Sequence, residues 1–211
     1  MSSAPDSEDR SRGSSLLELV VIVAVALGLA LGIQAFLIKP FRIPSGSMLP
    51  TLTIGERVLV NRIGTHFRDP KVGDIIVFHP PASADAESGP QCAQQPAPGA
   101  PCSTPGTTRA NVNFIKRLVG LPGDRISVRR GHVVRNGKLQ KEPFTSHTCD
   151  NGLGNACNLP ATITVPPGHY FMMGDNRGES DESRFWGPIP KSWIICGAFA
   201  TYWPPKRIGT L

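Results

Sequence analysis

The chain has 211 residues, of which 40% are hydrophobic and 18% charged, so it is long and apolar enough to form one core of good size. Its formal net charge of +6 favours an acidic partner, either a nucleic acid or an anionic membrane surface. The basic residues are scattered and are not clustered with aromatic ones, which argues against nucleic acid. Membrane lipid is the expected partner of this charge.

The N-terminal part divides into a polar and an apolar segment. Residues 1–15, "MSSAPDSEDRSRGSS", are Ser-rich and predict a disordered cytoplasmic tail, because they cannot bury enough apolar surface to become ordered. Residues 19–38, "LVVIVAVALGLALGIQAFLI", carry no charge and a single Gln. A helix of about 20 such residues spans the hydrocarbon core of a bilayer. Residues 16–38 are therefore predicted to form a transmembrane helix.

A cleaved signal peptide is the alternative interpretation of this segment. Residues 24–26, Ala-Val-Ala, have the small-x-small form of a cleavage site, but they lie inside the apolar run and not after it. We therefore predict an uncleaved anchor. Arg10 and Arg12 precede the span while Lys39 and Arg42 follow it, so the positive charges do not decide its orientation.

The five cysteines indicate a compartment. Cys92 and Cys102 flank a Pro/Ala/Gly-rich segment, and Cys149 and Cys157 flank the turn-rich "DNGLGNA". Two pairs that each close a short polar loop predict disulfides and an oxidising environment. Cys196, in "WIICGAFATYW", is expected to be a buried free thiol. Together with the anchor, this predicts a single-pass protein of the cell membrane with its N-terminus in the cytoplasm and its body on the extracytoplasmic side.

Metal sites are the competing interpretation of two segments. The grouping of His147, Cys149 and Cys157 suggests zinc, but four ligands at a suitable spacing are missing. The acidic run around residues 175–182 suggests a calcium loop, but the alternation of oxygen ligands fails at Arg177. No metal or cofactor is predicted.

Residues 39–211 contain short apolar runs rich in Val, Ile and Phe, separated by Gly, Pro and Asp. The runs "ERVLVNRI", "DIIVFHP", "NFIKRLVG", "DRISVRRGHVVRNG", "ATITVPPGHYFMMG" and "WIICGAFATYW" are typical of strands. Asn136-Gly137 predicts a hairpin turn. We expect a mostly antiparallel β domain. The Pro/Ala/Gly-rich segment 80–111 interrupts the pattern and is expected to be a surface loop held by the Cys92–Cys102 bridge.

Two polar elements are ambiguous when each is considered alone. The stretch "IPSGSMLP" directly after the apolar segment is explained by turn chemistry, since Ser and Gly between prolines favour a turn. Lys116, in the apolar strand "NFIKRLVG", is either a solvated lysine or a desolvated amine with a lowered pKa that is free to accept a proton.

Three motifs in one order change this interpretation. "SGSM" just after the anchor, "IKRLVGLPGD" and "GDNRGESDESR" together make the chain similar to bacterial type I signal peptidases, membrane-bound Ser/Lys proteases that release exported proteins from their signal peptides. The likeness covers the anchor and nearly the whole body except the tail and the segment 80–111. It implies a serine endopeptidase that acts on signal-peptide-bearing preproteins without a cofactor.

The resemblance assigns roles to individual residues. It implies that Ser47 is the nucleophile, that Lys116 is its general base, and that Ser45 with the Ser47 backbone N–H binds the oxyanion. Ser180 matches the serine that orients the lysine amine. The substrate pockets would be lined by Phe41, Ile43, Val58, Phe114 and Ile115. The supporting loop would comprise Gly174, Asp175, Asn176, Arg177, Glu182, Ser183 and Arg184. Glu182 departs from the family pattern Ser-x-Asp-Ser-Arg, which puts its support of Arg184 in question.

Two rival functions follow from the same features. A self-cleaving repressor shares the Ser/Lys chemistry, but such proteins are soluble and carry a DNA-binding region, which the membrane span argues against. A non-enzymatic, membrane-anchored β module would explain the anchor, the strands and the disulfides but not the three motifs. Ser47→Ala separates these readings, because it would abolish cleavage by a peptidase and leave binding by a module intact.

Overall fold

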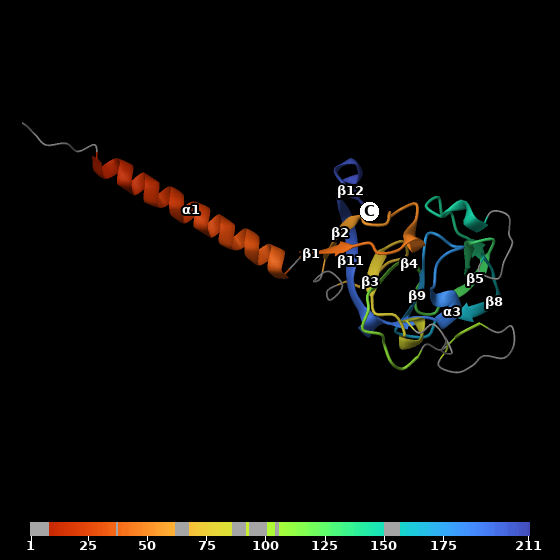
Figure 1. Ribbon diagram of the computed structural model, residues 1–211. Helices are drawn as coiled ribbons and strands as arrows, with labels where there is room; N and C mark the ends of the chain where they lie inside the picture. Colours follow the sequence, from red (N-terminus) through yellow and green to blue (C-terminus); the bar gives the residue numbers. More distant parts are fainter. Residues whose placement is uncertain are drawn as a thin grey trace, which may run out of the picture. The chain divides into compact units, whose positions relative to one another are not determined.

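The computed structural model describes residues 9–36, 38–61, 68–85, 92, 101–103, 106–149 and 157–211. The chain divides into two units, Met1–Lys39 and Pro40–Leu211. The first contains helix α1 (Asp9–Phe36), drawn in red in Figure 1. Residues 9–15, expected to belong to a disordered tail, are thus helical, because a helix nucleated in the apolar segment gains one hydrogen bond for each residue added. Residues 1–8 lie outside the described residues.

The predicted transmembrane helix is not confirmed. α1 ends at Phe36, two residues before the predicted end at residue 38. Judged on the residues that the structure describes, none of the helices combines the length and the apolar character that a membrane crossing requires.

The second unit is mostly β, as predicted (Figure 1). The strands are β1 (Ile38–Arg42), β2 (Arg57–Asn61), β3 (Ile75–Phe78), β4 (Phe114–Gly120), β5 (Arg125–Arg129), β6 (His132–Arg135), β7 (Lys138–Leu139), β8 (Leu159–Thr164), β9 (His169–Met173), β10 (Ile189–Pro190), β11 (Ile194–Trp203) and β12 (Gly209–Thr210). The helical turns are η1 (Gly46–Met48), η2 (Ala82–Asp85), η3 (His147–Cys149), α3 (Ser183–Trp186), η5 (Lys191–Trp193) and η6 (Pro205–Arg207).

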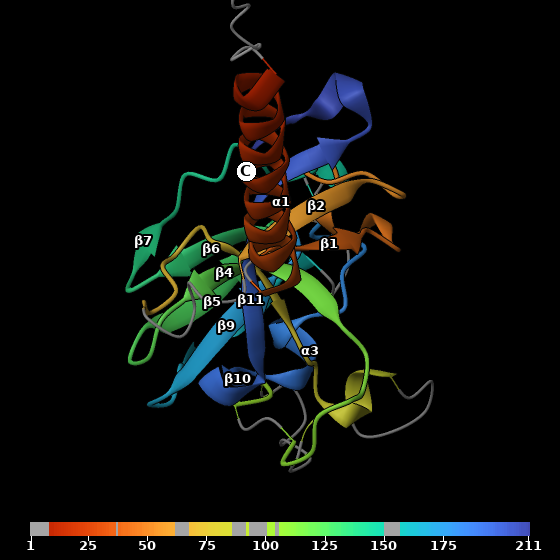
Figure 2. The same cartoon turned by 90° about the vertical axis from the view of Figure 1, so that its left-hand side faces the viewer.

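The strands form two sheets. The larger has the order β1-β2-β11-β3-β4-β9-β10, with β12 paired to β11, and the smaller has the order β7-β6-β5-β8. Figure 2 shows β9 and β10 side by side, where Ile189 pairs with Tyr170 in antiparallel register. Every apolar run predicted to be a strand contributes at least one. The predicted hairpin is confirmed, since Arg135 pairs with Lys138 and both turn residues, Asn136 and Gly137, have positive φ.

The pattern of apolar runs did not predict β1, β10 or β12. The last two are short, with two residues each. β1 contains Pro40, which cannot donate to a ladder and is tolerated at the edge of a sheet. β1 occupies such an edge. This matters for the site, because the chain passes from β1 directly into the "PSGS" segment.

The two sheets are joined through β9. Ile126 and Val128 of β5 share a buried apolar cluster with Phe171 and Met173 of β9. β9 in turn pairs with β4, with Leu118 opposite Met172. Lys116 on β4 lies opposite Ile76 of the fully buried β3, so its backbone belongs to the interior of the larger sheet.

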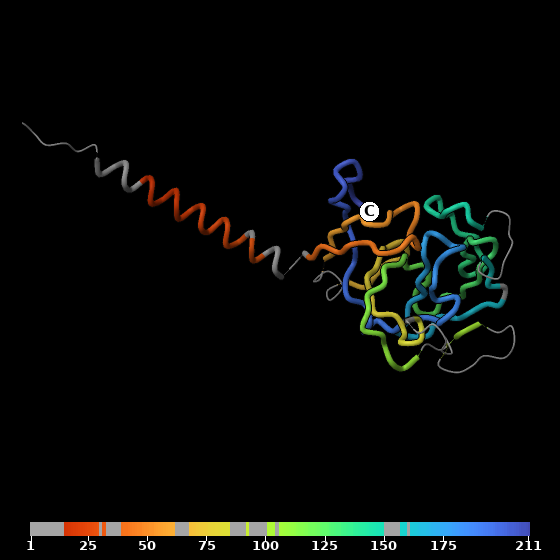
Figure 3. The backbone as a smooth tube through the Cα atoms, in the orientation of Figure 1, coloured from red at the N-terminus to blue at the C-terminus, as the bar shows by residue number. Residues whose placement is uncertain are grey.

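Both predicted disulfides are present, Cys92–Cys102 and Cys149–Cys157. Cys196 is buried in β11. The described ends of the segment 80–111 pair with one another, since Ala82 N donates to Thr108 O and Ala110 N donates to Pro80 O. The described ends of the segment therefore lie next to each other between β3 and β4, which are drawn as tubes in Figure 3.

Candidate active site

Ser47 lies on the single turn η1, between the edge strand β1 and the strand β2. Met48 anchors this turn, because its side chain is fully buried in an apolar cluster with Ile43, Leu52 and Val58. A backbone hydrogen bond also holds the turn, since Asn176 N donates to Ser47 O at 3.0 Å. The Ser47 side chain is 8% exposed and is thus held in place at the margin of the core.

Lys116 reaches the same point from β4. Its Nζ lies 2.6 Å from Ser47 Oγ, within hydrogen-bond distance. The side chain is 4% exposed, and its Nζ also lies 5.5 Å from the centre of the Phe114 ring. The structure therefore brings together two residues that are 69 positions apart in the chain.

Burial lowers the pKa of Lys116 from 10.5 to about 8, because desolvation disfavours the ammonium form. The negative charges of Glu182, Asp181 and Asp175 oppose this effect, and the positive charge of Arg184 supports it. From the sequence, Lys116 was either a solvated lysine or a desolvated amine with a lowered pKa. Burial is present, but the carboxylates are not remote, so the lowered pKa is the balance of the two.

Ser45 lies on the exposed side of Ser47. Its Oγ is 3.4 Å from Ser47 Oγ, and its backbone is extended. Both serines and Lys116 line a cavity of about 380 Å³. Its other lining residues are Pro44, Gly46, Asn113, Phe114, Ile115, Glu179 and Asp181. A serine hydroxyl beside a buried amine in a cavity supplies the two groups that nucleophilic catalysis by a serine requires, an alcohol and a base.

The matching family model, "Signal peptidase, peptidase S26", covers residues 16–203. The chain belongs to this family. It is 35% identical over 207 residues to "Signal peptidase I" of Leptolyngbya laminosa, covering 98% of this chain and 89% of that protein. It is 38% identical over 194 residues to "Probable signal peptidase I-1" of Synechocystis sp., covering 92% and 86% respectively. A solved signal peptidase I of Enterococcus faecalis V583 aligns with a TM-score of 0.40 at 23% identity, over 62% of this chain and 97% of that one.

Membership in the signal peptidase family makes the chain an enzyme, a serine protease of the hydrolase class. The predicted family is confirmed. Cleavage of signal peptides is the activity that the family supports.

Ser180 is buried close to Ser47 in this peptidase. Its side chain is 6% exposed, and its Oγ has no hydrogen-bond partner among the described residues. Gly174 separates it from Ser47, since a Cβ at this glycine would overlap both Ser180 Oγ and Ser47 O. Only glycine fits there. The predicted orientation of the lysine amine by Ser180 stays a prediction.

The supporting loop of the peptidase is tied to the sheet by buried ion pairs. Asp175 accepts two bonds from Arg117, at 2.9 Å and 2.7 Å. Arg177 is fully buried and pairs with Glu142 at 2.7 Å. No role was predicted for Arg117 or Glu142 from the sequence. Arg117 follows Lys116 in the same motif and was discoverable by strand alternation, whereas Glu142 lies in a loop with no pattern to mark it.

The rest of the loop meets β9 and η1. Ser183 Oγ accepts a bond from Met172 N at 2.9 Å, and Asn176 Nδ2 donates to Gly46 O at 3.2 Å. Glu182, the departure from the family pattern, accepts from Gly174 N at 2.6 Å and from Arg184 Nε at 2.5 Å. The longer side chain thus still pairs with Arg184.

Four of the five predicted pocket residues gather around a second cavity of about 310 Å³, lined by Phe41, Arg42, Ile43, Pro44, Val77, Val112, Asn113, Phe114 and Ile115. It shares Pro44, Asn113, Phe114 and Ile115 with the cavity at Ser47, so the two adjoin. Val58, the fifth predicted residue, is fully buried in the apolar cluster that contains Ile43.

Two other places were candidates for chemistry. Cys149 and Cys157 are bonded to each other, which removes both thiolates from the zinc grouping considered with His147. Across the described ranges, no three His, Cys, Asp or Glu side chains gather as metal ligands do.

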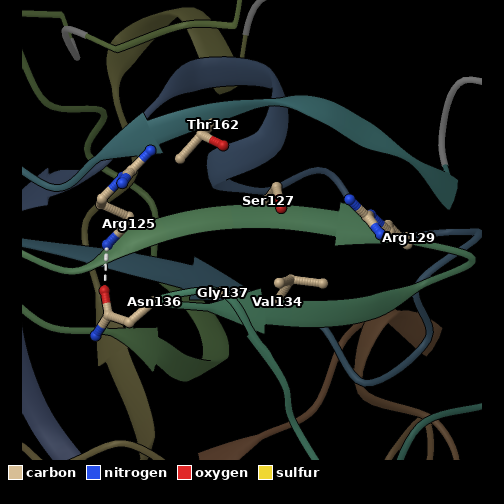
Figure 4. Close-up of a pocket in the computed structure, with 7 residues that line it drawn as sticks. All are labelled: Arg125, Ser127, Arg129, Val134, Asn136, Gly137 and Thr162. Atoms are coloured by element: carbon tan, nitrogen blue, oxygen red, sulfur yellow. Dashed lines mark hydrogen bonds between the residues drawn. The ribbon is translucent and has the colours of Figure 1, made fainter.

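A larger cavity of about 440 Å³ lies on the smaller sheet and is lined by Arg125, Ser127, Arg129, Val134, Asn136, Gly137 and Thr162 (Figure 4). Its ionisable lining residues are arginines, which do not act as bases.

Proposed function

We propose that the chain is a membrane-anchored serine endopeptidase that removes N-terminal signal peptides from exported preproteins with a Ser47/Lys116 dyad. The observation that carries this proposal is the 2.6 Å approach of Lys116 Nζ to Ser47 Oγ. Serine is a poor nucleophile until a base accepts its proton, and a lysine is a base only where its pKa is lowered. Burial of Lys116 supplies that condition.

The proposed reaction has two halves. Neutral Lys116 takes the hydroxyl proton of Ser47 while Ser47 Oγ forms a bond to the scissile carbonyl carbon. The tetrahedral intermediate collapses, the C–N bond breaks, and the Lys116 ammonium gives its proton to the leaving amine. Lys116, neutral again, then takes a proton from water, whose oxygen attacks the Ser47 ester. The ester bond breaks, the new C-terminal carboxyl group leaves, and Ser47 recovers its proton.

Two further serines assist in this proposal. The Ser45 hydroxyl and the Ser47 backbone N–H donate to the oxyanion of the intermediate. The closeness of Ser45 Oγ to Ser47 Oγ, 3.4 Å, supports this role. Ser180 holds the lysine amine toward Ser47 when substrate is bound, and its buried hydroxyl beside Gly174 supports that role.

The apolar cavity beside the dyad receives the side chains that precede the scissile bond. Phe41, Ile43, Phe114 and Ile115 are bulky apolar residues of its wall. We expect it to accept small residues such as Ala at the first and third positions before the bond. A larger side chain would overpack the cavity, which costs about 1–3 kcal/mol.

The anchor is the apolar segment 16–38. Its run of residues 19–38 carries no charge and one Gln, and a helix that is apolar all round requires an apolar environment. We place the N-terminus in the cytoplasm and the catalytic domain on the extracytoplasmic side of the cell membrane, where disulfides form. Substrates held in the same membrane would then meet the site at a high effective concentration.

The test is cleavage of one precursor by the detergent-solubilised full chain, with the cut mapped by mass spectrometry. We expect a single cut after a small residue, and no cut with Ser47→Ala. Ser127→Ala is the matched control, because Ser127 is buried to the same 8% exposure but lies on the other sheet. Full cleavage by Ser47→Ala, or cleavage abolished equally by both variants, contradicts the proposal.

A further inference from the structure

Three carboxylates act on Lys116, and they differ in how they are paired. Asp175 is bound by Arg117 at 2.7 Å, and Glu182 is bound by Arg184 at 2.5 Å. Each of these carboxylates is thus paired with a guanidinium. Glu182 still raises the pKa of Lys116 more than Asp181 does, but the charge of its partner Arg184 acts on Lys116 in the opposite direction. Asp181 makes no comparable salt bridge with any residue in the described ranges.

Asp181 also differs in its position. It lines the same cavity as Ser47 and Lys116, whereas Asp175 and Glu182 are fully buried. Its Oδ1 is buried and has no hydrogen-bond partner of normal geometry among the described residues. The Glu182 backbone N–H and the Trp186 side chain also lower the pKa of Asp181, but less than the charge of Lys116 does. A buried carboxylate oxygen without a partner is costly unless a positive charge lies near it, and the cation that shares its cavity is Lys116.

The other surroundings of Lys116 contribute little charge. β3, which pairs with β4 on one side, consists of apolar residues only. On the other side β9 carries its titratable residues, His169 and Tyr170, at the end opposite the one nearest the loop. Glu179 lines the cavity but is exposed to water, which screens it.

We propose that Asp181 is a positioning residue that acts through Lys116, as the unbalanced counter-charge of the general base, and thereby sets the pH range in which the peptidase works. This inference rests on the proposed function of Lys116 as the base. Its physical basis is that Asp181 and Lys116 each shift the pKa of the other. Burial raises the pKa of Asp181 while the charge of Lys116 lowers it, and the Asp181 carboxylate in turn raises the pKa of Lys116. The Asp181 carboxylate thus keeps the Lys116 amine charged until the pH rises, and this lowers the activity at neutral pH.

The experiment is the pH profile of kcat/KM on a soluble precursor peptide, with the full chain in detergent. Such a profile reports the ionisation of the free enzyme. Asp181→Asn removes the charge and keeps the shape. We expect its acidic limb to move by about 0.5–1 pH unit toward lower pH, which is a 3- to 10-fold higher kcat/KM well below the limb.

Two further variants sharpen this test. Asp181→Glu keeps the charge and should leave the limb near that of the wild type. Glu179→Gln removes the exposed carboxylate of the same cavity and should not move the limb. The position of a limb does not depend on the amount of folded enzyme, so partial misfolding of a variant does not mimic the effect.

The outcomes separate the inference from the function on which it rests. An unmoved limb in Asp181→Asn, a shift toward higher pH, or an equal shift in Glu179→Gln overturns the role of Asp181. If Ser47→Ala or Lys116→Arg retains cleavage, the dyad itself is wrong. If both are inactive and the limb of Asp181→Asn does not move, only the present inference fails.

Discussion

Two serines of this chain lie beside cations, Ser47 on the turn η1 and Ser127 on the smaller sheet, and both are 8% exposed. Ser47 is 2.6 Å from the amine of Lys116, which is itself 4% exposed. Ser127 lies between Arg125 and Arg129 on β5, and both arginines are exposed (Figure 4). The difference lies in the cation and not in the serine. A guanidinium keeps its proton, and an exposed cation is solvated, so the second arrangement holds a charge but cannot accept a proton.

Exchanging the cation beside each serine should have the largest effect on the difference between the two places. Lys116→Arg should lower kcat by a factor on the order of 10⁴ or more, because the new side chain keeps its charge and cannot take the proton of Ser47. The mirror exchange, Arg125→Lys, should leave kcat unchanged. Both are measured on the same precursor peptide. An active Lys116→Arg enzyme would falsify the role of the lysine as base.

A second contrast concerns the hydroxyls. Ser45→Ala should lower kcat by about 10²–10³, the usual effect of losing one oxyanion donor, with little change in KM. Ser45→Thr keeps a hydroxyl and should retain more activity than Ser45→Ala. Ser127→Ala, on the smaller sheet, should have wild-type kcat. A near-normal kcat of Ser45→Ala would contradict the role as oxyanion donor and mean that Ser45 is only a turn residue.

The pH dependence sharpens the same contrast. Only the neutral form of Lys116 accepts a proton, and burial lowers the pKa of this group to about 8. The kcat/KM should therefore fall about tenfold for each pH unit below 8 and level off above it. A lysine as exposed as Arg125 would give a limb near its ordinary pKa, about 10.4. A profile that is flat between pH 6 and pH 8 is incompatible with this base.

The smallest expected effect is on stability. Lowering the pKa of Lys116 from 10.5 to about 8 corresponds to about 3 kcal/mol of destabilisation while the amine is charged. Lys116→Met should therefore stabilise the inactive protein by as much as about 3 kcal/mol below pH 8. The unfolded chain binds the proton more tightly, so wild-type stability rises between about pH 8 and 10.5 and the advantage of Met fades there. Lys138→Met, at an exposed site, is the control in denaturant unfolding.

The sequence by itself determined most of the strands, the disulfide pairs and the family. Alternation and turn residues suffice for β3, β4 and the Asn136-Gly137 hairpin, because these depend on neighbours along the chain. The order of three motifs implied that Ser47 and Lys116 form the proposed dyad. The sequence did not predict β1, whose Pro40 is acceptable only because the strand lies at an edge. Nor did it predict that residues 9–15 join the helix.

The tertiary structure decided what surrounds the dyad. Whether Lys116 is solvated or buried depends on β3, β9 and η1, which pack around it from distant parts of the chain, and burial is what lowers its pKa. The partners of the supporting loop, Arg117 and Glu142, are likewise set by contact across the fold. Contact across the fold also decides that Glu182 is paired with Arg184, whereas Asp181 shares the cavity with Lys116. Charge and desolvation act through space, and spacing along the chain does not encode them.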